Sequence, residues 1–154
     1  MDIVQYFGTY NSLVENMQIA LKLWVDAKED FYYITGIQID DMPKAKAEAK
    51  RRGLDSLMEN IETLGEKYIN LKLSCEDERK RCKRDIDKLE SKLYRLIIEY
   101  AFLDMDKDKK ILNTLKTYHN MDISYGYFRN SKSKAIKEFE TLISTSMWST
   151  FSFV

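Results

Sequence analysis

Apolar residues recur at helical rather than alternating spacing over most of the chain. Between residues 10 and 34 they follow in steps of three and four and form one helical stripe, made of Tyr10, Leu13, Met17, Ala20, Trp24, Ala27, Phe31 and Ile34. We expect this helix to start at a cap, Asn11 or Ser12, since Ser12 and Glu15 have capping-box spacing. It should end near Thr35 and Gly36, before a loop that runs to Pro43, which has no amide donor and suits the first turn of the next helix.

A heptad pattern follows. From residue 44 to 103 an apolar residue or cysteine recurs every seventh position, as Leu54, Ile61, Tyr68, Cys75, Cys82, Leu89, Leu96 and Leu103. Its companion positions are Leu57, Leu64 and Leu71 and then, one residue later in the heptad, Ile86, Leu93 and Tyr100. The buried face therefore rotates near Arg79, and we expect a small break, a kink or a change of packing partner between residues 74 and 84. Helices of this length need partners, so residues 1–85 are interpreted as a helical coiled-coil and dimerisation region.

Residues 86–143 have the pattern of three shorter amphipathic helices, at about 86–103, 107–118 and 124–144. The predicted core face of the second carries Ile111, Leu112 and Leu115, and that of the third carries Phe128, Ala135, Phe139 and Leu142. After them, residues 147–154 alternate large apolar and small polar side chains, which predicts a strand-like tail that docks on the protein or a partner. The expected fold class is thus all-α, with a helix-turn-helix module over 86–144 and a docking tail over 145–154.

Composition narrows the function classes. The chain has no N-terminal leader pattern and no run of about 18 apolar residues, so we expect a cytoplasmic protein that does not enter a membrane. Cys75 and Cys82 would lie about 10 Å apart on one helix, too far for a disulfide, and are expected to be reduced thiols in the apolar seam.

Candidate catalytic chemistry is sparse. His119 is the one histidine, which excludes a multi-histidine metal site, and a role in the turn is the preferred interpretation for it. Residues 104–108 resemble the start of a calcium loop, but Lys109 and Leu115 stand where Gly and the bidentate Glu are needed, so a cap and turn is the preferred interpretation. We expect no cofactor, no metal and no enzymatic activity.

The C-terminal third carries a positive surplus although the formal net charge of the whole chain is zero: residues 105–154 have 8 basic and 5 acidic side chains. A helix, a short turn at 119–122 and a second helix form a helix-turn-helix outline, in which the second helix enters the major groove of DNA. The outward residues of that helix are predicted to contact DNA, Arg129 and Asn130 at base edges and Lys132 and Lys134 at phosphates. The full predicted set is Ser124, Tyr125, Tyr127, Arg129, Asn130, Lys132 and Lys134.

Three segments carry a family resemblance: KLYRLIIEYAFL at 92–103, ILNTL at 111–115 and ISYGYFRNSKSKAIKEF at 123–139. They resemble the sigma-region-4-like module of the RinA and ArpU-like transcriptional regulators of phages that infect Gram-positive bacteria. The resemblance implies a helical N-terminal half before the module. It also implies DNA-facing roles for Tyr125, Tyr127, Arg129, Asn130 and Lys132 in a bacterial cytoplasm.

Two functional hypotheses remain open at this point, besides a purely structural spacer. The first is a homodimer that binds duplex DNA and regulates transcription, with host RNA polymerase or another host protein as a further partner. The alternative is a phage-encoded helical protein that inhibits a host complex, such as a defence nuclease, by protein contact.

Overall fold

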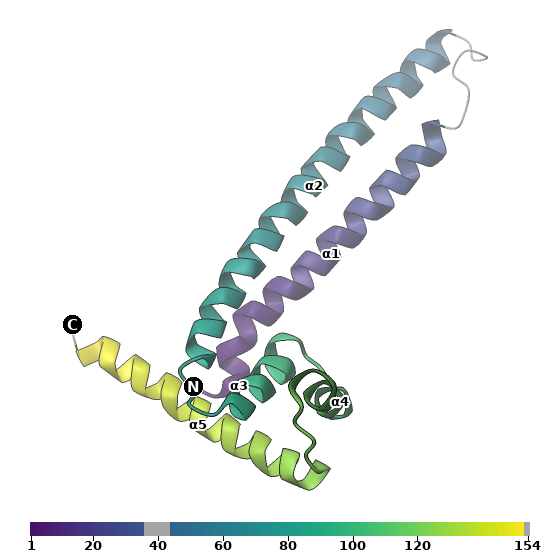
Figure 1. Ribbon diagram of the computed structural model, residues 1–154. Coiled ribbons are helices and arrows are strands. Elements are labelled where there is room, and N and C mark those ends of the chain that lie inside the picture. The colour runs from purple at the N-terminus through teal and green to yellow at the C-terminus, as the bar shows by residue number, and fades with distance from the viewer. Residues whose placement is uncertain (36–43, 153–154) are drawn as a thin grey trace. The chain divides into compact units, whose positions relative to one another are not determined.

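The computed structural model describes residues 1–35 and 44–152, with side chains described over 1–33, 48 and 51–145, and over these residues it is all-α, as the sequence predicts (Figure 1). The helices are α1 Ile3–Thr35, α2 Lys44–Ile86, α3 Lys92–Ile98, α4 Asp108–His119 and α5 Tyr125–Ser152, and a π-helical turn, η1 Glu99–Leu103, follows α3. α1 ends where the sequence places its end, whereas the expected loop and Pro43 lie outside the described residues.

The chain divides into two compact units, Ser12–Glu76 and the remainder, Met1–Asn11 with Asp77–Val154. Helices α1 and α2 each contribute to both. We call Ser12–Glu76 the hairpin unit and the other the C-terminal unit.

In the hairpin unit, α1 and α2 run antiparallel beside each other (Figure 1). The rings of Trp24 and Tyr68 are 5.6 Å apart, and Trp24 packs onto Gly65, where the absence of a side chain leaves room for the indole. The heptad residues of α2 in this unit, from Leu54 to Cys75, are half-buried or buried. The heptad seam is therefore occupied within the chain.

The C-terminal unit has the larger core. Ile3, Phe7 and Tyr10 of α1 are buried, and the Phe7 ring stacks on Phe102 at 5.5 Å and on Phe139 of α5 at 5.6 Å. These contacts tie the first turns of α1 to α5.

The predicted start of α1 at Asn11 or Ser12 is wrong, because the helix begins at Ile3. Asp2 is its actual cap: its side chain accepts a hydrogen bond of 2.8 Å from the Gln5 amide, and its own amide donates to the Gln5 side chain at 3.2 Å. An Asp followed three residues later by Gln was therefore the signal in the sequence.

The expected break between residues 74 and 84 is absent, since α2 continues to Ile86 and the interruption comes at residues 87–91. The alternative of a changed packing partner agrees with the structure, because the boundary between the two compact units lies at Glu76 and Asp77. Leu89 is buried in the turn at residues 87–91, and the Arg95 guanidinium donates to the carbonyls of Leu89 at 2.6 Å and Glu90 at 3.0 Å. Ser91 then caps α3 by accepting from the Tyr94 amide at 3.3 Å. The predicted single helix over 86–103 is thus α3 and η1, which begin only at Lys92.

The predicted strand-like tail is replaced by helix: α5 does not end at Ser144 but continues through Ser152. Alternation of large and small residues is compatible with a helix when the preceding turns already supply the hydrogen bonds that propagate it.

Candidate nucleic-acid interface

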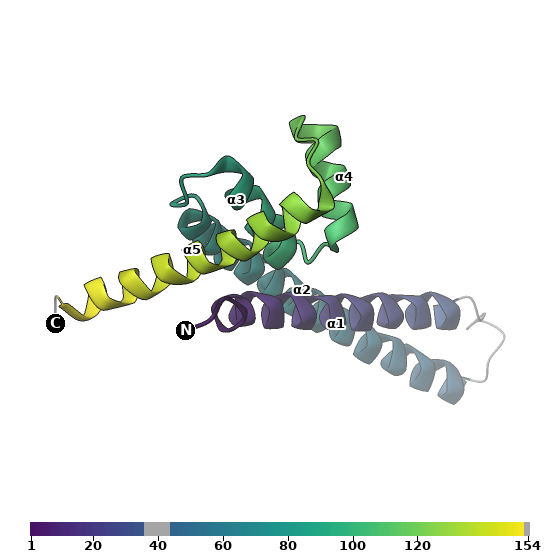
Figure 2. The same ribbon diagram turned by 90° about the horizontal axis from the view of Figure 1, so that it is seen from below.

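The helices α3, α4 and the first half of α5 surround a small core (Figures 1 and 2). Ile97, Ile111, Leu115 and Phe128 are fully buried at its centre. On α5, Ala135 and Phe139 continue the buried face at intervals of seven and four residues, as predicted, while Leu142 is half-buried. The opposite face of α5 is thereby turned away from this core.

The connection between α4 and α5 is short and defined. Asn120 ends α4 in the left-handed conformation, with φ 54°, and the Met121 amide donates to the Leu115 carbonyl at 3.0 Å. Ser124 caps α5 by accepting from the Tyr127 amide at 3.2 Å, and its carbonyl accepts from the Phe128 amide at 2.9 Å. The predicted start of this helix at Ser124 is therefore accurate to one residue.

Six of the seven residues predicted to contact DNA have exposed side chains: Ser124, Tyr125, Tyr127, Arg129, Asn130 and Lys134. Arg129 lies over the ring of Tyr125, 5.8 Å from its centroid. Gly126, Arg129, Asn130 and Ser133 line a shallow hollow on the same surface. Residues 125–137 carry four basic side chains and no acidic one, so the exposed half of α5 is cationic over about 20 Å.

Lys132 differs from the other six. It is half-buried, and its ammonium donates to Asp108 at the start of α4 over 2.9 Å. The ion pair joins the two helices of the outline, so a substitution at Lys132 would alter the module as well as its surface charge.

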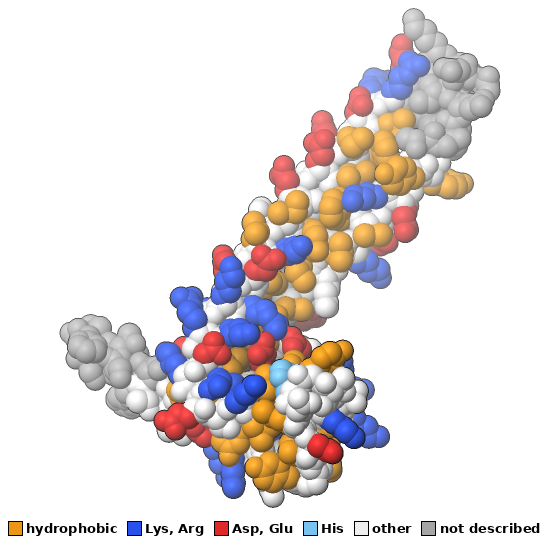
Figure 3. All heavy atoms as spheres, in the orientation of Figure 1, with side chains coloured by type: hydrophobic (Ala, Val, Ile, Leu, Met, Phe, Trp, Pro, Cys, Tyr) orange, Lys and Arg blue, Asp and Glu red, His pale blue; other side chains and the backbone are white. Residues whose placement is uncertain are grey.

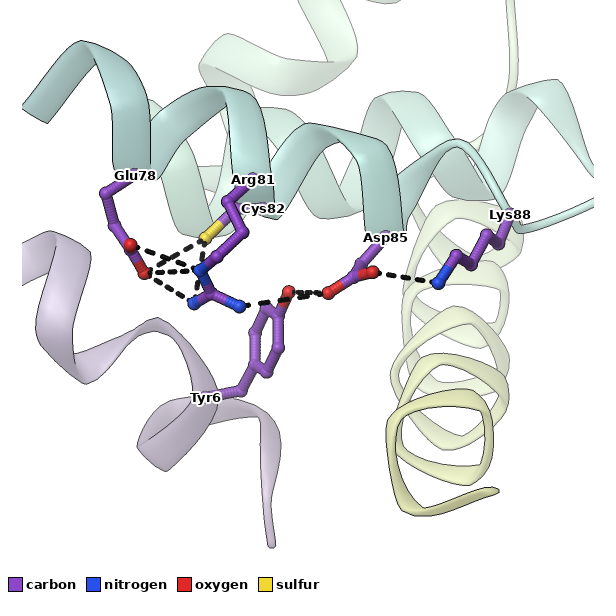
Figure 4. Close-up of polar contacts among 6 residues, drawn as sticks. All are labelled: Tyr6, Glu78, Arg81, Cys82, Asp85 and Lys88. Carbon is purple, nitrogen blue, oxygen red and sulfur yellow. Dashed lines mark hydrogen bonds and ion pairs between the residues drawn. The ribbon is translucent and has the colours of Figure 1, made fainter. Parts of the chain in front are cut away.

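A polar cluster that the sequence did not indicate lies where α1 meets the end of α2 (Figure 4). Tyr6 donates a hydrogen bond to Asp85, which also pairs with Lys88 at 3.1 Å, and Arg81 pairs with Glu78. Cys82 is fully buried among these groups. Burial raises the pKa of Cys82 to about 11, and burial together with the hydrogen bond to Asp85 raises the pKa of Tyr6.

A second polar network ties α2 to η1. Arg79 donates to Tyr10 at 3.2 Å and to Asp104 at 2.9 Å, and Lys83 pairs with Glu99 at 3.3 Å. The hydroxyl of Tyr100 in η1 lies 2.8 Å from Nε2 of His119, which places the chain's one histidine in a contact that holds η1 to the end of α4.

Over the described residues, no group of three or more His, Cys, Asp and Glu side chains is arranged to hold a metal ion. Within the same ranges, no helix combines the length and apolar character needed to cross a bilayer. Both cysteines are free thiols and buried, as predicted, but Cys82 lies among the groups of the polar cluster rather than in an apolar seam.

Comparisons of the chain with family models, curated proteins and solved structures found no match.

Proposed function

We propose that the protein binds duplex DNA through α4, the connection at 120–124 and α5, as a homodimer that regulates transcription. The observation that carries the proposal is the exposed face of α5, which presents Arg129, Asn130 and Lys134 without an acidic residue over 125–137. Arginine and asparagine are the side chains suited to guanine and adenine edges, and lysine suits phosphates.

The dimensions of α5 support the same proposal. An α-helix is about 10–12 Å across with its side chains, which fits the major groove of about 12 Å. The cationic stretch of α5, about 20 Å long, is capped at Ser124 and anchored by buried Phe128 and Phe139. Rigid elements favour binding because the backbone need not be ordered on contact. Host RNA polymerase would remain a further partner of such a regulator.

The proposal is tested by the affinity of the full chain for a duplex of random sequence, measured by fluorescence anisotropy at low salt. Arg129→Ala with Lys134→Ala should weaken binding on the order of 10-fold or more and reduce the slope of log affinity against log salt by about one, because Lys134 is the phosphate contact of the two and Arg129 the contact to base edges. Both residues are exposed, so helicity measured by circular dichroism should be unchanged.

The matched control is Arg52→Ala with Lys67→Ala, which removes one arginine and one lysine from exposed positions in the hairpin unit. It should leave the affinity within about twofold, since these residues lie outside the proposed interface. Equal losses of affinity in both double variants would show that binding depends on net charge alone and would overturn the assignment to α5.

A second candidate function is inhibition of a host complex by protein contact. The hairpin unit favours it, because residues 12–76 carry nine basic and twelve acidic side chains and therefore repel DNA rather than attract it. This function predicts no measurable affinity for duplex DNA at low salt, so the same anisotropy experiment separates the two candidates.

A further inference from the structure

The hairpin unit buries few of its own residues. Among those that the structure describes between Ser12 and Glu76, only Ala20, Gly65 and Cys75 are buried. Two helices alone bury only the side chains along their shared contact. The part of an apolar stripe that extends beyond this contact therefore stays in water. Such helices are stabilised chiefly by packing against further elements.

Most of the exposed large apolar residues of the hairpin lie on one side of it. Leu21 and Val25 on α1 and Met58, Ile69 and Leu73 on α2 are between 37% and 54% exposed. At 3.6 residues per turn, each of these residues is rotated around the helix axis by about 60–140° from the residue that faces the other helix, which is Trp24 on α1 and Tyr68 on α2. The rotation has the same direction for all five. Because α1 and α2 are antiparallel, that direction leads to the same side of the hairpin.

We call this surface the apolar band; it comprises Val14, Leu21, Val25, Tyr32, Met58, Ile69 and Leu73. Figure 3 shows hydrophobic side chains gathered along the hairpin on the viewed face. The opposite side is different. There α1 exposes Ile19 and Leu23, at 53% and 47%, but α2 presents the polar residues Asn60, Lys67 and Ser74. Over the described residues, the band is the side on which both helices expose large apolar residues, although Lys28 on α1 and Lys72 on α2 lie at its inner edge.

We propose that a second copy of this chain covers the apolar band, band against band, about a two-fold axis parallel to the helices. In that arrangement α1 of one copy lies beside α2 of the other at the same level and antiparallel to it. Every neighbouring pair of helices then repeats the relation of α1 to α2 within one copy, as in an up-and-down four-helix bundle.

The size of the band fits this occupant. From Val14 to Tyr32 it extends for about 27 Å, and two helices about 10 Å wide give about 500 Å² per copy. The total of about 1,000 Å² reaches the area at which specific protein interfaces begin. A partner that covered one helix alone would leave half of the band in water.

The charges beside the band define the register of the two copies. Trp24 is level with Gly65 and Tyr68, so Lys22 on the edge of α1 lies within about one helical turn of the level of Glu66 on the edge of α2. In the symmetric arrangement Lys22 of one copy faces Glu66 of the other, which is attractive. Glu29 faces Glu62, which is repulsive. The two positions therefore predict opposite effects of charge reversal.

The first experiment is sedimentation equilibrium of the full chain without DNA, so its outcome does not depend on the proposed DNA binding. The wild type should be a dimer at tens of micromolar, and Ile69→Glu with Leu73→Glu should raise the dissociation constant on the order of 100-fold or more. The control, Ile19→Glu with Leu23→Glu, introduces the same charges at equally exposed positions on the opposite side and should remain dimeric. A monomeric wild type, or equal losses in both variants, would overturn the proposal.

Charge reversal gives a second measurement that does not disturb the apolar residues. Lys22→Glu and Glu66→Lys should each weaken the dimer about three- to tenfold, and their combination should restore it, whereas Glu29→Lys should strengthen it by a similar factor. Circular dichroism checks that helicity is unchanged. Additive losses in the double variant, with no restoration, would show that these helices do not face one another across two copies and would reject the arrangement.

Discussion

At the scale of single residues, Tyr6 and Cys82 couple the start of α1 to the end of α2. Tyr6 donates to Asp85, and the neighbouring Cys82 thiol is fully buried. Burial disfavours the charged form of both groups, so their pKa values in the folded protein lie above those of the unfolded chain. The folded state therefore holds protons that the unfolded state releases at alkaline pH.

This difference predicts how stability depends on pH. A group whose pKa is raised on folding contributes stability below its unfolded pKa and loses it as the pH rises; for Cys82 the window extends from about 9 to about 11. The free energy of unfolding, measured by urea titration in reducing buffer, should be lower at about pH 10.5 than at about pH 8.5. These two pH values lie near the ends of this window. Tyr6→Phe with Cys82→Ala should be less stable at pH 8.5 but show a shallower fall, and an unchanged slope would contradict the assignment.

At the scale of the secondary-structure elements, two glycines inside α2 have opposite roles. Gly53 has open space where a side chain would begin, with nothing within 4 Å. Gly65 instead lies under Trp24, whose ring would be 3.0 Å from an added Cβ atom. Alanine has a higher helix propensity than glycine at either position. Of the two glycines, however, only Gly65 allows the close approach of α1.

Substitution of these glycines should separate the two roles. Gly53→Ala should raise the free energy of unfolding by about 0.5–1 kcal/mol, because alanine loses less backbone entropy in a helix. At Gly65 the same gain is offset by displacement of the indole, so Gly65→Ala should give no net gain and Gly65→Val should destabilise by about 1–3 kcal/mol. Urea titration measures each change, and a gain at Gly65 equal to that at Gly53 would show that α1 does not pack there.

At the scale of the whole molecule, the two proposals concern different units of the chain. The cationic face of α5 belongs to the C-terminal unit and the apolar band to the hairpin unit. One module of this size makes few contacts with DNA, so a pair joined through the band would bind more tightly without any new contact to the bases.

The two proposals together make a prediction that neither makes alone. Ile69→Glu with Leu73→Glu should abolish the dimer and weaken binding to duplex DNA, with the slope of log affinity against log salt reduced by about half, because one module rather than two contacts phosphates. Arg129→Ala with Lys134→Ala should weaken DNA binding and leave the dimer intact. Anisotropy and sedimentation on the same samples measure both, and a band variant that is monomeric yet binds DNA like the wild type would separate dimerisation from DNA binding.

The sequence by itself determined the helices and the faces they bury. The periodicity predicted the all-α class, the end of α1 at Thr35, the position of α4 to within one residue and the buried side chains of Ile111, Leu115, Phe128, Ala135 and Phe139. These features could be predicted because helical periodicity depends on local spacing alone.

Tertiary structure decided what each buried face packs against. The heptad pattern does not distinguish a seam between two copies from the seam between α1 and α2 that forms here, and the interruption at 87–91 depends on Arg95 binding the carbonyls of Leu89 and Glu90. Likewise Lys132 was predicted as an outward cation, but it pairs with Asp108 on another helix. Periodicity specifies which side of a helix leaves water, whereas its partner depends on contacts between residues far apart in the chain, which no local pattern contains.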